Sequence, residues 1–244
     1  MGLLDFFFPK HCVNCRKIGD YICANCFSFI SFDVSMICLV CNKGSIDGLT
    51  HPGCRGKYTI DGAFAGVSYK RTIKKLIYNF KYKPYLADLR SVLTDLFCES
   101  LIQQELFQKA LGFSPILVPI PLYSKRLRKR GYNHAKLLTE GLSKKLNLKM
   151  VEVLQRTKET KSQFGLTLKE RKENIKDAFT LAPNIPAFAK ASTFANASAD
   201  RSAGKANILL VDDILTTGST LLEAAKMLKK SGVKKVWGLT LARD

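Results

Sequence analysis

Apolar and polar positions along the chain form blocks that predict alternating strands and helices. Short runs of mostly branched apolar residues are typical of strands buried on both faces of a parallel sheet. The predicted strands are Ala63–Tyr69, Pro115–Ile120, Val151–Gln155, Asn207–Asp212 and Val236–Leu241. Apolar residues at helical spacing predict the helices Leu86–Leu111, Asn133–Leu146 and one beginning at Ser219. This order predicts an α/β domain with a mainly parallel sheet.

The most informative block runs from Ile208 to Thr220, where an apolar strand leads into a polar loop and then a helix. Asp212 and Asp213 follow the apolar run, and Gly218 lies among hydroxyl side chains. Free N–H groups at a helix N-terminus favour a phosphate, while the two carboxylates could accept hydrogen bonds from adjacent ribose hydroxyls. An ordinary capped turn is the alternative, but it needs only one short polar residue. The predicted phosphate-binding residues are Thr216, Thr217, Gly218, Ser219 and Thr220.

A second polar cluster follows the strand that ends in the sequence Val-Pro-Ile-Pro-Leu. Because prolines end this strand, we expect the arginines after it to lie on a loop. Arg126, Arg128 and Arg130 would then offer fork-shaped donors to an anion. Right-handed crossovers would bring this loop and the loop after Asp212 to the same edge of the sheet.

The N-terminal region contains two Cys-x-x-Cys pairs, Cys12 with Cys15 and Cys23 with Cys26. Two such pairs complete the tetrahedral thiolate set of a structural zinc ion. A disulfide framework is the alternative, but the other motifs are typical of an intracellular nucleotide enzyme.

A further group, Cys38, Cys41, His51 and Cys54, has spacing that would close a second zinc site. The alternative is that His51 caps a loop and that the cysteines bind no metal. Since these first 55 or so residues contain no long periodic apolar run, metal binding would supply their folding energy. We therefore predict a zinc-binding module over 1–58 and an α/β domain over 59–244.

Basic residues outnumber acidic ones 39 to 20, which gives a formal charge of +19 and predicts polyanionic partners. One basic cluster is interleaved with tyrosines and phenylalanine, an arrangement that suits single-stranded nucleic acid. A solvated basic face with the aromatic rings turned into the core is the equal alternative. The predicted nucleic-acid contacts are Lys74, Lys75, Lys81 and Lys83.

No apolar stretch approaches the roughly 18 to 20 residues that span a bilayer, so we expect a cytoplasmic protein. The apolar residues between Leu3 and Phe8 are expected to pack onto the domain. A peripheral contact with the inner face of the membrane is the alternative.

The whole string Ile208–Thr220 resembles the 5-phosphoribosyl-1-pyrophosphate (PRPP) motif of type I phosphoribosyltransferases. Together with Val-Pro-Ile-Pro-Leu, the arginines before Gly-Tyr-Asn-His-Ala and the cysteine pairs, it resembles the ComF family. The resemblance implies a double zinc ribbon followed by a type I phosphoribosyltransferase fold, similar to amidophosphoribosyltransferase. It also implies catalytic roles for Asp212 and Asp213, pyrophosphate binding by the arginines, and Mg²⁺ held chiefly by PRPP oxygens.

ComF proteins are associated with DNA uptake in natural transformation, so the resemblance implies a role with single-stranded DNA and a competence helicase. The alternative is an active transferase of nucleotide salvage or synthesis. Its acceptor is not identified by any residue, so whether the chain is an enzyme stays open.

Two further segments follow from the same resemblance. The region from Leu154 to Leu166, with Arg171 and Asn174, is similar to a hood that closes over PRPP, although Arg171 and Asn174 would equally suit a surface helix. The segment at about 183–206 is rich in alanine, serine and asparagine without amphipathic period, which predicts a disordered insertion.

Overall fold

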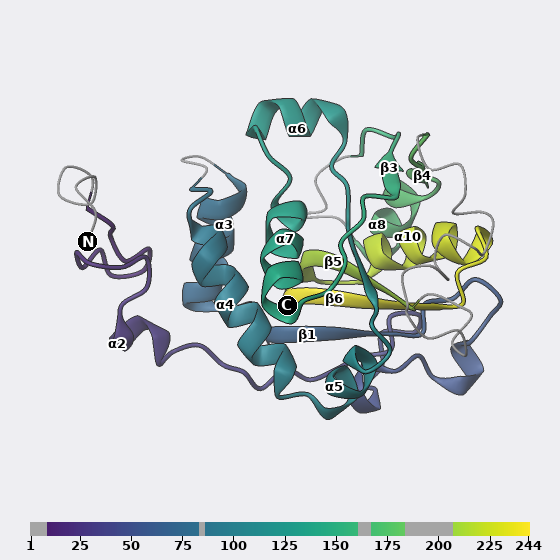
Figure 1. Cartoon of the computed structure of the whole chain (residues 1–244), viewed down its shortest axis with the longest axis horizontal. Helices are drawn as coiled ribbons and strands as arrows, with labels where there is room; N and C mark the ends of the chain where they lie inside the picture. The colour runs from purple at the N-terminus through teal and green to yellow at the C-terminus, as the bar shows by residue number, and fades with distance from the viewer. Residues whose placement is uncertain (1–8, 83–85, 161–166, 184–206) are drawn as a thin grey trace.

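The computed structural model describes residues 9–82, 86–160, 167–183 and 207–244. Lys83, the apolar N-terminal residues and nearly all of the predicted insertion lie outside these described residues. A four-stranded parallel sheet has the order β1-β6-β5-β2 (Figure 1). Its strands are β1 (Gly62–Ser68), β2 (Ile116–Pro119), β5 (Asn207–Leu215) and β6 (Lys235–Arg243). The prediction of an α/β domain with a mainly parallel sheet is confirmed.

Apolar side chains on both faces of this sheet form two core clusters. In β5, Ile208 and Leu210 belong to the cluster that includes α10 (Ser219–Lys230), whereas Leu209 and Val211 belong to the cluster on the opposite face. The helices that contribute to the opposite face are α3 (Arg71–Lys81), α4 (Leu89–Ile102), α5 (Glu105–Leu111) and α7 (His134–Leu146). Successive side chains of a strand point to opposite faces, and both faces of this sheet are covered. Residues pointing either way are therefore apolar, which explains the continuous apolar runs in the sequence.

The predicted single helix over Leu86–Leu111 is wrong, because the chain forms two helices, α4 and α5, in this region. Gln104 adopts an extended conformation between them, and its side-chain amide donates a hydrogen bond to the carbonyl of Ala65 in β1 at 3.0 Å. Gln104 therefore bonds to the sheet and does not continue the helix. Apolar periodicity alone does not reveal this break between the two helices.

The prediction that Val151–Gln155 joins the main sheet is also wrong. Of the described residues in this region, only Met150 forms a bridge to Leu117 of β2. The strand β3 (Leu154–Arg156) pairs instead with β4 (Phe179–Leu181) in an antiparallel pair. The helix α8 (Leu168–Ile175) precedes β4 in the sequence. The apolar residues that suggested a central strand are used in the core, where Val153 is fully buried.

The described part of the segment before β1, residues 9–61, contains little regular structure. Its elements are the short helices α2 (Ala24–Phe27), η1 (Ile46–Gly48) and η2 (Pro52–Cys54). Two antiparallel bridges, His11 with Ile18 and Ile37 with Gly44, close two similar turns. In the part of the chain that the structure describes, no helix is both long and apolar enough to cross a membrane.

Candidate functional site

The acid pair lies near the carboxyl end of β5. Strand pairing continues beyond the predicted end at Asp212, because Leu215 still pairs with Arg243 of β6. Asp212 and Asp213 are therefore part of the strand and are held by the sheet. The backbone N–H of Asp213 donates to Oδ1 of Asp212 at 2.9 Å, and the Asp213 side chain is only 3% exposed.

Two side chains from distant elements converge on Asp213. Nζ of Lys81, the last residue of α3, lies 2.6 Å from Oδ2 of Asp213, and Nε2 of His134 lies 3.3 Å from the same oxygen. Lys81 was predicted to contact nucleic acid, but its side chain is only 18% exposed and its charge is used in this buried ion pair. His134 was not predicted, although its place at the start of a helix, directly after the cap residue Asn133, is a usable signal.

These contacts separate the pKa values of the groups at the site. Burial and the neighbouring Asp213 charge raise the pKa of Asp212 to about 7. Burial alone would also raise the pKa of Asp213, but the charge and hydrogen bond of Lys81, together with His134 and Arg130, lower it. Burial lowers the pKa of His134 to about 3, so this imidazole is neutral near pH 7. The site therefore contains one fully ionised carboxylate beside one that titrates near neutrality.

The predicted phosphate loop connects β5 with α10. Gly218 has a φ of +70°, a left-handed conformation that favours glycine, and α10 begins at the next residue. The hydroxyls of Thr217 and Ser219 lie 2.9 Å apart. Since the first N–H groups of a helix lack intrahelical acceptors, this loop has the donors that a phosphate needs.

The arginine cluster lies on a helix, so the prediction of a loop is wrong. The helix α6 (Ser124–Arg130) begins after the prolines and ends at Gly131, whose φ is +83°. With 3.6 residues per turn, Arg126 and Arg130 share one face and are half-buried, whereas Arg128 is exposed on another. Arg130 Nη1 lies 2.5 Å from Nδ1 of His134, so only part of the predicted trio faces the acids.

Two guanidinium groups meet at Thr160, after β3. Arg126 donates to the carbonyl of Thr160 at 2.5 Å, and Arg156 donates to its hydroxyl. Burial and the charge of Arg126 lower the pKa of Arg156 to about 10, which still leaves it protonated at neutral pH. Among the described residues its Nε has no hydrogen-bond partner. Two cations held together in this way favour an anion between them. Arg156 lies in the segment predicted as a hood but was not predicted to bind an anion.

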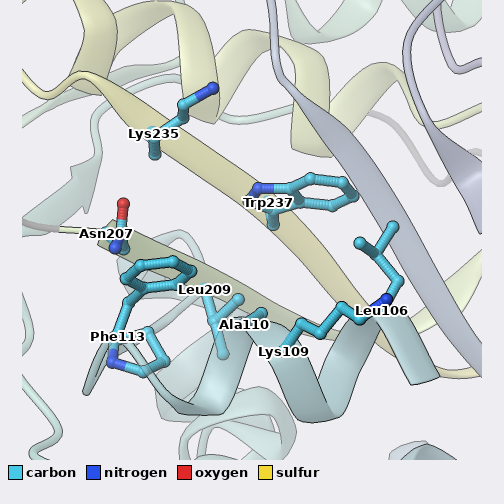
Figure 2. Close-up of a pocket in the computed structure, with 9 residues that line it drawn as sticks. Leu106, Lys109, Ala110, Phe113, Asn207, Leu209, Lys235 and Trp237 are labelled. Atoms are coloured by element: carbon cyan, nitrogen blue, oxygen red, sulfur yellow. The ribbon is translucent and has the colours of Figure 1, made fainter. Parts of the chain in front are cut away.

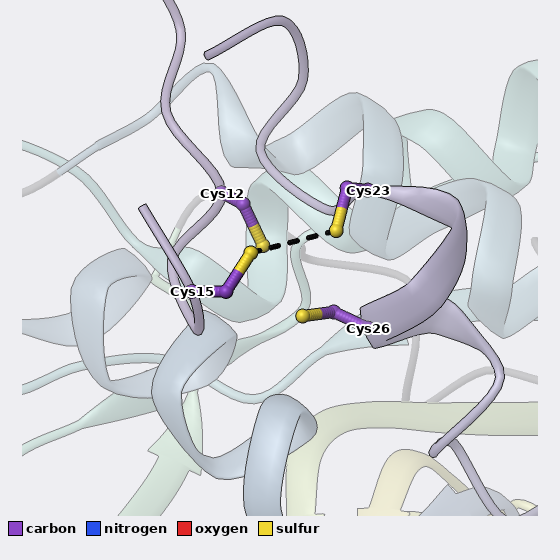
Figure 3. Close-up of side chains that lie close together, drawn as sticks. All are labelled: Cys12, Cys15, Cys23 and Cys26. Carbon is purple, nitrogen blue, oxygen red and sulfur yellow. Dashed lines mark hydrogen bonds between the residues drawn. The ribbon is translucent and has the colours of Figure 1, made fainter. Parts of the chain in front are cut away.

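The four N-terminal cysteines converge as the spacing predicted. Figure 3 shows the sulfur atoms of Cys12, Cys15, Cys23 and Cys26 pointing toward one another, and these atoms all lie within 4.8 Å. Burial would raise the pKa of Cys12, but hydrogen bonds from backbone groups of Cys15 and Cys23 lower it to about 6. A closed set of four thiolates is compatible with structural zinc.

The second group also converges, with ligand atoms of Cys38, Cys41, His51 and Cys54 within 4.8 Å of one another. Nδ1 of His51 lies 3.4 Å from the sulfur of Cys41, and Nε2 lies 3.0 Å from the carbonyl oxygen of Gly44. A proton on Nε2 would leave Nδ1 free for a metal, the usual arrangement of a histidine ligand. The donor set fits a second structural zinc ion.

The two clusters are built on the same turn. In the first, the N–H of Arg16 donates to the carbonyl of Cys12 at 2.9 Å, and in the second the N–H of Asn42 donates to Cys38 at 2.8 Å. Both donor residues follow the second cysteine and adopt positive φ values, 68° and 58°. This repetition favours the metal interpretation over an unmetallated loop at the second cluster.

The phosphoribosyl transferase domain family matches residues 134–244, a range that includes His134, the acid pair and the phosphate loop. Competence protein F of Haemophilus influenzae is 40% identical over 129 residues, which cover 52% of this chain and 50% of that protein. DNA utilization protein YhgH of Escherichia coli K12 is 32% identical over 126 residues, which cover 50% and 48%. Competence protein ComFC of Streptococcus pneumoniae R6 is 26% identical over 240 residues, which cover 95% and 87%.

These similarities support a ComF-family protein with a phosphoribosyltransferase domain. In this chain the domain is preceded by a cysteine-rich region consistent with a zinc-ribbon module. The first two relatives are matched over about half of their own length, whereas the similarity to ComFC extends over nearly the whole chain.

The exposed face of α3 combines cations with aromatic rings. Lys74 and Lys75 are exposed, and the rings of Tyr78 and Tyr82 lie 5.0 Å apart with 55% and 44% of these residues exposed. Phe80, between the tyrosines, is fully buried. The predicted alternative, with aromatics turned into the core, therefore holds for Phe80 and not for the two tyrosines.

A cavity of about 310 Å³ lies at the opposite end of the sheet from the acid pair. Figure 2 shows its wall formed by Trp237 and Leu209, with Phe113 at one side and Asn207 and Lys235 at the amino ends of β5 and β6. Its walls are mostly apolar, which does not suit a phosphorylated sugar. The acids and the phosphate loop remain the candidate site.

Proposed function

We propose that this chain binds PRPP together with Mg²⁺ at the acid pair and phosphate loop, and that it acts in the handling of DNA during competence. The observation that carries the proposal is the buried pair Asp212 and Asp213 directly before a loop that opens α10. The phosphoribosyl transferase family match over the same residues supports it, as do the printed names of the relatives.

Each part of PRPP has a group of matching chemistry nearby. Asp212 and Asp213 would accept hydrogen bonds from the ribose hydroxyls, and the N–H and hydroxyl groups from Thr216 to Thr220 would bind the 5-phosphate. Arg126 and Arg156 would bind the pyrophosphate through their fork-shaped donors. Mg²⁺ would be held chiefly by oxygens of the ligand, where it would neutralise part of the pyrophosphate charge.

Calorimetric titration of PRPP and Mg²⁺ into the full-length protein tests this proposal. We expect saturable binding that is lost in the Asp212→Asn, Asp213→Asn variant and weakened in Thr217→Ala, which leaves the acids intact. Asp95→Asn is the matched control, because Asp95 lies on α4 and pairs there with Lys145. Thermal unfolding of each variant identifies loss of fold. No binding by the wild type at millimolar PRPP would refute the proposal.

We further propose that single-stranded DNA contacts the exposed face of α3. Lys74 and Lys75 would neutralise phosphates, while Tyr78 and Tyr82 would stack on unpaired bases. A cation–ring pair lies at the start of the same helix, where the guanidinium of Arg71 is 5.9 Å from the ring of Phe29. Lys81 is excluded from this face by its ion pair with Asp213.

Fluorescence anisotropy with a labelled oligonucleotide over a range of salt concentrations tests the DNA contact. Replacing Lys74 and Lys75 by glutamine should weaken binding and flatten the salt slope by up to about 0.7 per lost phosphate contact. Replacing Lys144 and Lys149, two exposed lysines elsewhere, makes the same charge change and should have a smaller effect. Equal effects of the two pairs would mean that net charge alone attracts DNA.

A further inference from the structure

The turn of the second cysteine cluster packs directly against the phosphate loop. Leu39 lies between the cluster residues Cys38 and Cys41 and is completely buried. A Cβ atom added to Gly218 would lie only 2.8 Å from Cδ2 of Leu39 and 3.2 Å from its Cβ. The side chain of Leu39 therefore fills the space beside Gly218, where any other residue would place its Cβ atom.

The same leucine is part of the core that supports both ends of the loop. Leu39 belongs to one apolar cluster with Leu215, which ends β5 just before the loop, and Leu221, in the first turn of α10. Because protein interiors are close-packed, a change in the position of Leu39 must be accommodated by these neighbours. Leu39, more than 170 positions earlier in the sequence, thus lies against this loop and shares its supporting core.

The position of Leu39 is in turn set by the cysteine turn. The N–H of Cys38 donates to the carbonyl of Lys43 at 2.9 Å, and the N–H of Asn42 donates to Cys38. This segment of the chain contains little regular structure. A metal ion held by Cys38, Cys41, His51 and Cys54 would fix the turn and with it the leucine.

The first cluster has a different attachment. Its neighbour Asn14 accepts a hydrogen bond from Lys75 at 3.3 Å, and the carbonyl of Cys26 accepts one from Thr72 at 3.3 Å. Both donors lie on α3, so the first cluster supports the proposed DNA-binding helix. The second cluster contacts the phosphate loop instead.

We propose that Leu39 is a positioning residue for the phosphate loop. Metal binding at the second cluster, and not at the first, fixes Leu39 and thereby determines how well the loop binds the phosphate of PRPP. The part of this inference that concerns affinity rests on the proposed PRPP site. The part that concerns loop order does not, because it can be measured without a ligand.

Hydrogen exchange and PRPP titration of three variants test this role. Leu39→Ala should increase exchange at the amides of residues 216–222 and weaken PRPP binding by about 3- to 30-fold. Leu39→Met keeps most of the side-chain volume and should retain both properties. Leu101→Ala is the matched control, because Leu101 is equally buried but lies on α4, in the core cluster on the opposite face of the sheet.

A second comparison addresses the metal. Cys41→Ser should lose metal from the second cluster and loosen the same amides, whereas Cys15→Ser should lose metal from the first cluster and leave them protected. Metal content measured by atomic emission and exchange of the ligand-free protein provide readouts that do not require activity.

The outcomes separate this inference from the proposed function. Faster loop exchange in Leu39→Ala and Cys41→Ser, but not in Leu101→Ala or Cys15→Ser, supports the positioning role even if the wild type binds no PRPP. Unchanged loop exchange in folded Leu39→Ala would overturn it, even if the wild type binds PRPP tightly. Equal loosening by Leu39→Ala and Leu101→Ala would also overturn it. If Leu39→Ala does not fold, loop exchange in Cys41→Ser decides in the same way.

Discussion

Asp212 and Asp213 are neighbours in the chain but have opposite pKa shifts. Burial raises the pKa of Asp212, whereas the ammonium of Lys81 lowers the pKa of Asp213 despite burial. Burial would lower the pKa of Lys81, but the two carboxylates raise it. At neutral pH the lysine and Asp213 form a buried ion pair, and removing one partner leaves the other as an uncompensated buried charge.

Lys81→Met should therefore reduce the free energy of unfolding by about 3 kcal/mol near pH 8. In the wild type, the lowered pKa of Asp213 contributes stability that is present above the ordinary aspartate pKa and lost only in stronger acid. In the variant both acids would have raised pKa values, so its stability should fall as the pH rises above about 4. The deficit should consequently be smaller at pH 5 than at pH 8.

Urea unfolding of the two proteins at pH 5 and pH 8 measures this difference. Lys74→Met is the control, since Lys74 is exposed on the same helix and its loss should cost little at either pH. A deficit that does not depend on pH would contradict the assignment of the ion pair.

At the scale of elements, the helical form of Ser124–Arg130 decides which arginines face the site. The sequence interpretation placed all three arginines on a loop and assigned all three to an anion. The helix instead places residues four apart on one face, so Arg126 and Arg130 lie together and Arg128 lies apart. The adjoining strand β3 adds Arg156, which shares the Thr160 contact with Arg126.

Arg126→Ala should weaken the binding of inorganic pyrophosphate by about tenfold or more, the effect of losing one charge-assisted hydrogen bond. Arg128→Ala makes the same change in charge on the same helix and should have an effect of twofold or less. Isothermal titration with pyrophosphate and Mg²⁺ compares them. A similar loss in both variants would place the pyrophosphate outside the proposed contact at Thr160.

At the scale of the whole molecule, the two cysteine clusters attach one irregular segment to two elements with proposed binding roles. The first cluster contacts α3 and the second contacts the loop before α10. Within α2, the carbonyl of Cys26 accepts a hydrogen bond from Thr72 of α3, whereas η1, later in the segment, packs against β1. Since so little regular structure supports the segment, its stability should depend on bound metal.

The purified chain should contain two zinc ions, one for each cluster. Native mass spectrometry should show one ion in Cys15→Ser and one in Cys41→Ser, and a strong chelator should lower the unfolding temperature of the wild type. Cys98→Ser is the control, because Cys98 lies on α4 outside both clusters and should leave the metal content unchanged. One ion in the wild type would contradict the interpretation of one cluster.

Local patterns predicted much of the α/β architecture. The apolar runs located β1, β2, β5 and β6, and Asn133 marked the start of α7 as its cap. Such signals are short-range. An apolar run consists of adjacent residues, and a cap residue directly precedes the helix that it caps. The same signals failed at Val151–Gln155, where pairing with the distant strand β4 decided the structure, and at Gln104, where a side-chain hydrogen bond to β1 did so.

The sequence by itself determined which reactive groups occur together in this protein: two sets of four side chains with metal-ligand spacing, two adjacent acids and a glycine-containing hydroxyl loop. These features depend on spacing within one turn or one loop. Only the tertiary structure brought Lys81 and His134 to Asp213, turned Arg126 away from Arg128, and placed Leu39 against Gly218. Such contacts join residues far apart in the chain, and the packing of whole elements decides them.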